Sequence, residues 1–565
     1  MTVQRRWAFP DPPSPQAREA LTAFPQTLQQ LLVNRGIETA DAADLFLRPD
    51  ERLAGNPTDI PGMDAAVHRI RQAMFGSEKI GIYGDFDSDG VTGAALLCEA
   101  LSNVGLSVTP YIPSRAEGHG MNRAALKTLR DDGCTLVITA DCGVGGVNDG
   151  VAPPKGMDII VTDHHLPGDD LPDFAAIVNP MRRDSAYPSP KLAGVGVAFK
   201  LAQAIHQELG KELPDGLLEL VALGTVADVS PLVDENRYLV TEGLTGMRDS
   251  QRPGLRILAS IARRPLARIT SGDIAFQIAP RLNAAGRLTH ANDALNLLST
   301  HDEDEARTLA IHLDELNQRR RELTEEAYKR VRERMTDDDT TAPVIVAGAP
   351  DIPAGIVGLV AGRLTEEFYR PSFVYSTYGD GLLRGSARSI EEFDVEGALK
   401  QSADLLTRFG GHHRAAGFSA LESNLPAFRD RLHELAAKAL DGIDLTPTLT
   451  IDAEGAPSRL AADLTSHMDK LEPYGEGNRN PVFVARGLRV NSTRRVGDGS
   501  HLRLSLAEPQ SGMEWNAIAF RLGEKAGEAR REIDIAFQFQ ENDGGPKANR
   551  SPALELNVQD FRPSA

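Results

Sequence analysis

Apolar and polar residues follow two different spacings along this chain. Between residues 61 and about 200, short apolar runs alternate with segments that carry apolar residues at helical spacing. Alternation of this kind is typical of an α/β unit with a largely parallel sheet. The runs that predict strands are Ile80–Tyr83, Leu136–Thr139, Ile159–Thr162 and Ala176–Val178.

The remaining segments predict other structures. The first 60 residues and the region 201–300 have mainly helical patterns, and 301–335 is a highly charged run typical of a long exposed helix. A second α/β segment begins near Pro343, and short alternating runs from Thr446 onward predict a small β-barrel. We therefore expect an α/β fold of two α/β domains joined by a long helix, plus a C-terminal barrel. The predicted division is 1–60, 61–300, 301–335, 340–441 and 446–565.

Length and composition limit the class of protein. The chain has 565 residues, too many for one hydrophobic core, and 41% of them are hydrophobic, as in ordinary globular proteins. No apolar stretch is long enough to span a bilayer, and Pro10 follows Phe9 where a signal peptide would need an apolar core, so we expect a cytoplasmic protein without membrane contact. Cys98, Cys134 and Cys142 lack the spacing of a zinc site and cannot pair evenly in disulfides.

The formal net charge of −19 at pH 7 bears on possible partners. A uniformly acidic surface repels a polyanion, so nucleic acid could bind only in a locally basic channel that metal ions assist. The charge therefore argues against nonspecific coating of duplex DNA, and it does not argue against an enzyme.

Three carboxylates on alternate residues give the clearest chemical signal. Asp85, Asp87 and Asp89 lie between a strand-like run and a helix-like segment that starts at Val91. Like charges this close repel one another strongly in a low-dielectric loop, so a folded chain keeps them ionised mainly by placing a cation between them. A solvated acidic turn is the simpler alternative. A calcium hand is disfavoured, because its twelfth position would be Leu96 instead of glutamate.

Further carboxylates and imidazoles follow other predicted elements. Asp141 and the run Asp163-His164-His165 each follow a predicted strand, and Asp228 lies in a turn-rich segment. The carboxyl ends of parallel strands meet at one edge of a sheet, where ligands bind. Each residue alone is more often a cap or a turn residue. Together they form an oxygen-rich set with imidazole, which suits Mn²⁺ or Mg²⁺ better than Zn²⁺, and two such ions can promote phosphoryl displacement.

Several short motifs follow one another along the chain. They are Asn34-Arg35-Gly36, Asp85-Phe86-Asp87-Ser88-Asp89-Gly90, Ala140-Asp141-Cys142-Gly143, Asp163-His164-His165, Ala227-Asp228, Ala279–Arg287 and Gly410-Gly411-His412-His413. The four acidic motifs resemble, in the same order, those of the DHH phosphoesterase superfamily. The chain as a whole resembles the RecJ single-strand exonucleases, which implies a DHH-associated domain and an oligonucleotide-binding (OB) barrel after the DHH domain.

The resemblance implies two divalent cations, Mn²⁺ or Mg²⁺, that Asp141 bridges. Asp163 would orient a neighbouring imidazole, as metal-bound histidines usually require, and His165 would face the scissile phosphate as a donor or acid. Some relatives carry a histidine four residues before the first aspartate, where this chain has Gly81, and we expect Asp89 to supply the missing ligand. The implied ligand sets are Asp87, Asp141, His164 and Asp228 for one ion, and Asp85, Asp89 and Asp141 for the other.

Basic residues would have to hold the substrate. Arg281 and Arg287 flank a glycine- and alanine-rich segment that we interpret as a turn, and a guanidinium can grip two phosphate oxygens. Ordinary salt bridges are the alternative for each arginine. Tyr474, Phe483 and Trp515 could stack on bases, and a place in the barrel core is the alternative for Phe483 and Trp515. The resemblance places a pocket for the 5′-terminal nucleotide at Ser386, Arg388 and His412. The predicted nucleic-acid contacts are Arg115, Arg281, Asn283, Arg287, Ser386, Arg388, Gly411, His412 and Tyr474.

The resemblance implies a two-metal 5′-to-3′ exonuclease on single-stranded DNA that releases 5′-mononucleotides in DNA repair and recombination. It also implies a single-strand-binding protein and a helicase as partners, and we expect a monomer. An oligoribonuclease or cyclic-dinucleotide phosphodiesterase of the same superfamily is the first alternative, although such enzymes usually lack the connecting helix and the barrel. A noncatalytic DNA-binding scaffold is the second, and the complete set of acidic residues disfavours it.

Overall fold

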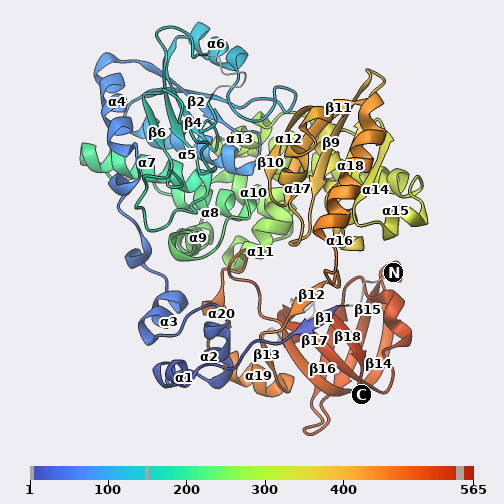
Figure 1. The fold of residues 1–565 in the computed structure, drawn as a ribbon. Helices are drawn as coiled ribbons and strands as arrows, with labels where there is room; N and C mark the ends of the chain where they lie inside the picture. The colour runs from blue at the N-terminus through green and yellow to red at the C-terminus, as the bar shows by residue number, and fades with distance from the viewer. Residues whose placement is uncertain (1–4, 147–151, 543–552, 565) are drawn as a thin grey trace.

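The computed structural model describes residues 5–146, 152–542 and 553–564. Figure 1 shows two α/β domains side by side in the upper half of the molecule, with a β-barrel and the N-terminal helices below them. The predicted fold class is confirmed. None of the helices in the described ranges combines the length and the apolar character needed to cross a bilayer.

The first sheet has five parallel strands in the order β3-β2-β4-β5-β6. Four of them agree with the prediction, whereas β3 is a partly exposed edge strand in which Pro110 weakens the strand pattern. Helices α4, α5 and α7 share a core with one face of the sheet, and α6 packs on the other face. The bounds are β2 (Lys79–Gly84), β3 (Ser107–Tyr111), β4 (Cys134–Ala140), β5 (Asp158–Thr162), β6 (Ala176–Val178), α4 (Met63–Gly76), α5 (Ser88–Asn103), α6 (Arg123–Asp131) and α7 (Gly194–Leu209).

A helical region connects this sheet to the second α/β domain. Its last helix, α14, is the long charged connector that the sequence predicts. One predicted turn is wrong, because Arg281 lies inside helix α12. Asp228 lies in the turn that ends helix α8. The bounds are α8 (Leu217–Ala227), α9 (Asp234–Met247), α10 (Pro253–Ile261), α11 (Ser271–Asp273), a π-helical turn (Ile274–Ile278), α12 (Ala279–Leu288), α13 (Asn292–Ser299) and α14 (Glu303–Arg332).

The second sheet is mixed, with the order β10-β11-β9-β8-β7. Only β7 and β8 run parallel, and the other neighbours pair antiparallel. Helix α16 packs with α14 on one core, and α18 packs on another that the same sheet supplies. The bounds are β7 (Ile345–Pro350), β8 (Ser372–Thr377), β9 (Leu382–Arg388), β10 (Leu406–His412), β11 (Ala415–Leu421), α16 (Ala354–Phe368), α17 (Val395–Lys400) and α18 (Leu425–Ala439).

The C-terminal strands close into a barrel, because β17 pairs with both β18 and β14. Its core contains Phe483 and Trp515, so neither ring is an exposed stacking platform. Leucines of the N-terminal helix α2 belong to the same core, and β1 pairs with β12. The bounds are β14 (Phe483–Val496), β15 (His501–Ala507), β16 (Glu514–Ala519), β17 (Glu532–Asn542), β18 (Ala553–Pro563), β1 (Arg6–Ala8), β12 (Thr448–Thr450), α2 (Gln26–Val33) and α3 (Ala40–Leu47).

Arg237 on α9 (Asp234–Met247) ties the barrel side of the molecule to the first domain. Its guanidinium is buried and donates hydrogen bonds to the backbone carbonyls of Phe46, Lys470 and Glu472 at 2.9, 2.9 and 2.7 Å. The cation also lies 3.9 Å from the ring centre of Phe46. One buried side chain therefore connects the N-terminal helices, the first domain and the segment that leads into the barrel.

Candidate metal centre

The acidic triplet lies where strand β2 passes into helix α5. Asp87 is the N-cap of α5, and its Oδ1 accepts hydrogen bonds from the backbone NH groups of Asp89 and Gly90 at 3.0 and 3.2 Å. A side-chain oxygen at this position satisfies NH groups that have no partner within the helix. The helix therefore starts at Ser88, three residues earlier than the apolar pattern suggests, and its first turn holds the carboxylates at the edge of the sheet.

The other acidic residues reach the same edge from separate elements. Asp141 follows β4 in a left-handed backbone conformation, with φ of 63°. Asp163, His164 and His165 follow β5, and Asp228 comes from the end of α8. Because strand ends and a helix end converge here, residues far apart in the sequence come together.

Their donor atoms form three overlapping groups, within each of which all donor atoms lie within 4.8 Å of one another. The groups differ from the predicted ligand sets: Asp87, not Asp89, lies with Asp85 and Asp141, and His165 joins a third group with Asp141 and His164. Both oxygens of Asp89 accept backbone NH groups at the start of α7, each at 2.8 Å, which holds this carboxylate on the other side of the site. The groups are Asp85, Asp87 and Asp141; Asp89, His164 and Asp228; and Asp141, His164 and His165.

Buried polar atoms without a hydrogen-bond partner show that this cluster suits cations. In the described part of the chain, Asp85 Oδ1, Asp141 Oδ1 and His164 Nε2 are buried and make no hydrogen bond. His164 Nε2 nevertheless lies 3.1 Å from Asp141 Oδ1. Two ligands that each lie about 2.1 Å from one ion at a right angle are about 3 Å apart. The residues present therefore fit divalent cations.

The electrostatics of the cluster favour the same conclusion. Burial, followed by repulsion from the neighbouring carboxylates, raises the pKa of Asp89 and of Asp141 well above its usual range. Burial also raises the pKa of Asp85 and of Asp228 and lowers the pKa of His164. A neutral imidazole can coordinate a metal ion, and bound cations would let the carboxylates ionise together.

Asp163 is buried and holds both histidines of the motif. Its Oδ1 accepts the backbone NH groups of His164 and His165 at 2.8 and 3.1 Å and lies 2.7 Å from His165 Nδ1. Burial acts to raise the pKa of Asp163, but the hydrogen bond with His165 and the backbone NH of Val144 lower it. The pKa of His165 is raised: burial acts to lower it, and the bond to Asp163 outweighs that effect. This pairing fixes the orientation of the His165 ring.

The second α/β domain reaches the cluster through His412 on β10. The rings of His412 and His165 are stacked, with their centres 5.9 Å apart and an interplanar angle of 13°. Gly411 precedes His412 on this strand. On the neighbouring β9, Arg388 donates a hydrogen bond to Ser386 Oγ at 3.0 Å. Four of the predicted nucleic-acid contacts thus lie on strands of the second domain, and one of them, His412, contacts His165 of the first domain.

Arginines from both domains gather beside the carboxylates. Arg287 on α12 donates to the carbonyl of Gly355 at 3.1 Å, and Arg115 lies over the ring of Phe86 at 4.3 Å. Burial, followed by repulsion from Arg115, Arg320 and Arg388, lowers the pKa of Arg287 to about 10. These guanidinium groups are therefore close enough to repel one another, and an anion would relieve the repulsion.

Three other predicted contacts are occupied within the protein. Arg281 is buried, forms an ion pair with Asp314 at 2.8 Å and donates to the carbonyl of Gln277, so it is turned away from a phosphate. Asn283 Oδ1 accepts the backbone NH of Ser88 at 2.9 Å and supports the metal loop. Tyr474 packs against the barrel core, and burial raises its pKa. Arg281 therefore makes the salt bridge that the sequence left open as its alternative, and Tyr474 is half-buried against the barrel core.

His119 lies at the cluster although no sequence motif includes it. Its Nδ1 is 3.0 Å from Asp85 Oδ1, and its ring meets that of His165 edge to face, with the centres 5.5 Å apart. Glycines on both sides of His119 could have marked a turn that presents a side chain, but the sequence gives no reason to join that turn to Asp85.

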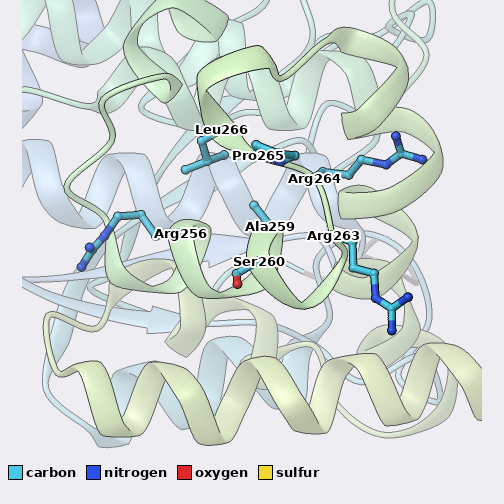
Figure 2. A pocket seen from close by; sticks show the side chains of 7 residues that line it. All are labelled: Arg256, Ala259, Ser260, Arg263, Arg264, Pro265 and Leu266. Carbon is cyan, nitrogen blue, oxygen red and sulfur yellow. The ribbon is translucent and has the colours of Figure 1, made fainter. Parts of the chain in front are cut away.

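A separate groove of about 570 Å³ lies along α10 (Pro253–Ile261) and the turn that follows it. Figure 2 shows Arg256 on one side of it, Arg263 and Arg264 on the other, and Ala259, Pro265 and Leu266 between them. It contains none of the predicted site residues. The groove is lined by Arg256, Ala259, Ser260, Arg263, Arg264, Pro265 and Leu266.

Known protein families match three parts of the chain. Residues 79–225 match the DHH family N-terminal domain, residues 341–438 match the DHHA1 domain, and residues 451–560 match the RecJ OB domain. The chain is 38% identical to the single-stranded-DNA-specific exonuclease RecJ of Bacillus subtilis (strain 168), over 87% of this chain and 63% of that protein. It is 36% identical to the protein of the same name from Dickeya dadantii (strain 3937), over 92% of this chain and 94% of that one.

Solved structures show the same likeness along nearly the whole chain. The crystal structure of RecJ in complex with Mn²⁺ from Thermus thermophilus matches with a TM-score of 0.83 and 31% identity, over 99% of this chain and 80% of that one. The corresponding Mg²⁺ complex matches with a TM-score of 0.78 and 31% identity, over 99% and 79% of the two chains. The family resemblance seen in the motifs is confirmed, and this chain belongs to the RecJ family of DHH-domain proteins.

Proposed function

We propose that this protein is a 5′-to-3′ exonuclease specific for single-stranded DNA, which releases 5′-mononucleotides by hydrolysis with two divalent cations, Mn²⁺ or Mg²⁺. The observation that carries the proposal is the buried cluster in which Asp85 Oδ1, Asp141 Oδ1 and His164 Nε2 lack hydrogen-bond partners. The names of the relatives in the family support the substrate.

The cluster divides into metal-holding and proton-transferring residues. Two bound cations would lower the pKa of a coordinated water and stabilise the attacking and leaving oxygens. Asp141 and His164 each belong to two of the three donor groups. We assign Asp141 as the shared ligand, because a carboxylate has two oxygens and can bind two ions, whereas His164 offers one ring nitrogen. The other ligands are Asp85, Asp87, Asp89, His164 and Asp228.

His165 is the residue best placed to transfer a proton. The bond to Asp163 at 2.7 Å holds its ring and raises its pKa, so the imidazolium can give a proton to the leaving 3′-oxygen. His412 stacks on the same ring and limits its rotation. Asp163 acts through His165 and is a positioning residue.

The arginines between the two domains would hold the strand. Arg115, Arg287 and Arg388 form no ion pair with an acidic residue in the described ranges, so their charges remain available to phosphate. Arg388 with Ser386, and His412 beside Gly411, would take the 5′-terminal phosphate. Arg115, Arg287, Arg388 and Ser386 are half-buried, which favours a single strand over a duplex, whereas Gly411 and His412 are exposed.

The finer points rest on the family likeness. We infer a cytoplasmic monomer that works with a single-strand-binding protein and with a helicase. The helicase is needed because an enzyme restricted to single strands requires another protein to open the duplex. We also propose the unit division 1–60, 61–300, 301–335, 340–441 and 446–565.

The test uses purified protein with DNA and RNA oligonucleotides labelled at either end, in Mn²⁺ or in chelator. We expect metal-dependent release of mononucleotides from the 5′ end of single-stranded DNA, and none from the Asp141→Asn variant. Preferred cleavage of short RNA or cyclic dinucleotides would favour the other superfamily activities. Equal cleavage in chelator would refute the two-metal site.

A further inference from the structure

We propose that His119 is an additional metal ligand, which completes the donor set of the cation held by Asp85, Asp87 and Asp141. This inference rests on the proposed metal-dependent function and extends its ligand set beyond the acidic and DHH motifs. The three carboxylates form the one donor group of the cluster that has no imidazole.

The distance between the two side chains is that of neighbouring ligands on one ion. His119 Nδ1 lies 3.0 Å from Asp85 Oδ1, close to the 3.1 Å between His164 Nε2 and Asp141 Oδ1. Asp85 Oδ1 is buried and has no other hydrogen-bond partner in the described ranges, so an ion can take the place of the direct contact with His119. Ligands about 2.1 Å from a cation and at right angles would have this separation.

The loop around His119 is built to present the imidazole. Gly118 and Gly120 have φ of 91° and 85°, a backbone region that favours glycine, and they place the histidine on a sharp turn. The hydroxyl of Tyr83, near the end of β2, donates to the carbonyl of Gly120 at 3.0 Å. This bond anchors the turn to the same sheet edge as Asp85.

The exposure of His119 places it on the open side of the site. Its side chain is 54% exposed, whereas that of Asp85 is 2% exposed. The carboxylate of Asp85 therefore approaches the ion from the protein interior, and the imidazole approaches from the exposed side. A ligand on that side would help to retain the ion before substrate arrives.

The experiment measures metal binding by the full chain without substrate. Metal-free protein is titrated with Mn²⁺, and the free ion is followed by its electron paramagnetic resonance signal. We expect two ions for the unchanged protein and for the control His312→Ala, which alters an exposed histidine on α14. In His119→Ala, one ion should keep its affinity and the other should bind about 10- to 100-fold more weakly.

A second measurement separates coordination from mere support of Asp85. In protein with ¹⁵N-labelled histidine, pulsed resonance of the bound Mn²⁺ should show fewer coupled nitrogens in His119→Ala than in the control. Unchanged affinity, or weaker binding with an unchanged nitrogen signal, would overturn the assignment. If the unchanged protein bound no Mn²⁺, the proposed function would fail as well, so the two failures are distinguishable.

Discussion

Replacing Asp141 with asparagine should change stability in opposite directions with and without metal. The substitution keeps the size of the side chain, and asparagine tolerates the left-handed backbone that Asp141 adopts at φ of 63°. It removes one charge from a group whose donor atoms lie within 4.8 Å of one another. Two like charges at that distance repel by about 3 kcal/mol at an effective dielectric constant of about 20.

Without metal, the variant should therefore be more stable at pH 8. Partial protonation already relieves some repulsion, because the pKa of Asp141 is raised by burial and by its acidic neighbours. We expect a gain of about 1–3 kcal/mol, or roughly 2–10 °C in melting temperature. Because the pKa of Asp141 is higher in the folded than in the unfolded protein, its carboxyl does not destabilise the fold below about pH 4. The destabilisation grows as the pH rises towards the folded-state pKa and is complete above it. The two melting curves should thus converge near pH 4.

With Mn²⁺ bound, the Asp141→Asn variant should be less stable than the unchanged protein. An ion at a concentration 100 times its dissociation constant stabilises the folded state by about 2.7 kcal/mol, so two ions add about 5 kcal/mol. The variant lacks the charge shared by two donor groups and should gain less than half of this. Differential scanning calorimetry at pH 8, in chelator and in Mn²⁺, measures both effects. A variant that melted lower in chelator, or gained as much from Mn²⁺ as the unchanged protein, would refute the reasoning.

Three further substitutions test separate parts of the site and the fold. His165→Asn should lower kcat about 100- to 10,000-fold with little change in KM, measured on labelled single strands. Arg388→Ala should weaken binding of single-stranded DNA and reduce the slope of log affinity against log salt by about one, while the exposed control Arg384→Ala should not. Arg237→Met should leave buried carbonyls without a donor and lower the free energy of unfolding by about 3 kcal/mol or more. The loss should appear as faster proteolysis near residues 470–473, and an unchanged cleavage rate would count against this role of Arg237.

The parts of the site that local patterns predict are those at strand ends. Asp85, Asp141 and His164 each follow an apolar run, and parallel strands bring their carboxyl ends to one edge whatever the rest of the chain does. The exchange of Asp87 and Asp89 between donor groups could not be predicted, because it depends on the NH groups of Gly194 and Val195, about 105 residues away.

The wrong predictions concern side chains whose partners are distant in sequence. Arg281 is directed inward because α14 brings Asp314 beside it, 33 residues later. His119 stands in a loop without periodicity, and only its contact with Asp85 identifies it. Spacing along the chain carries no information on such pairs.

The metal cluster and the arginine cluster together explain how a chain of net charge −19 can hold a polyanion. If arginines neutralised the carboxylates directly, neither metal nor phosphate would be needed. The fold instead directs Arg115 to the ring of Phe86 and the carbonyl of Gly286, and directs Arg287 to the carbonyl of Gly355. The carboxylates therefore still repel one another, and so do the arginines. Bound cations would relieve the repulsion among the carboxylates, and phosphate groups would relieve it among the arginines. Because the chain as a whole is acidic, binding of the strand is favoured only where the metal ions and the arginines are both present.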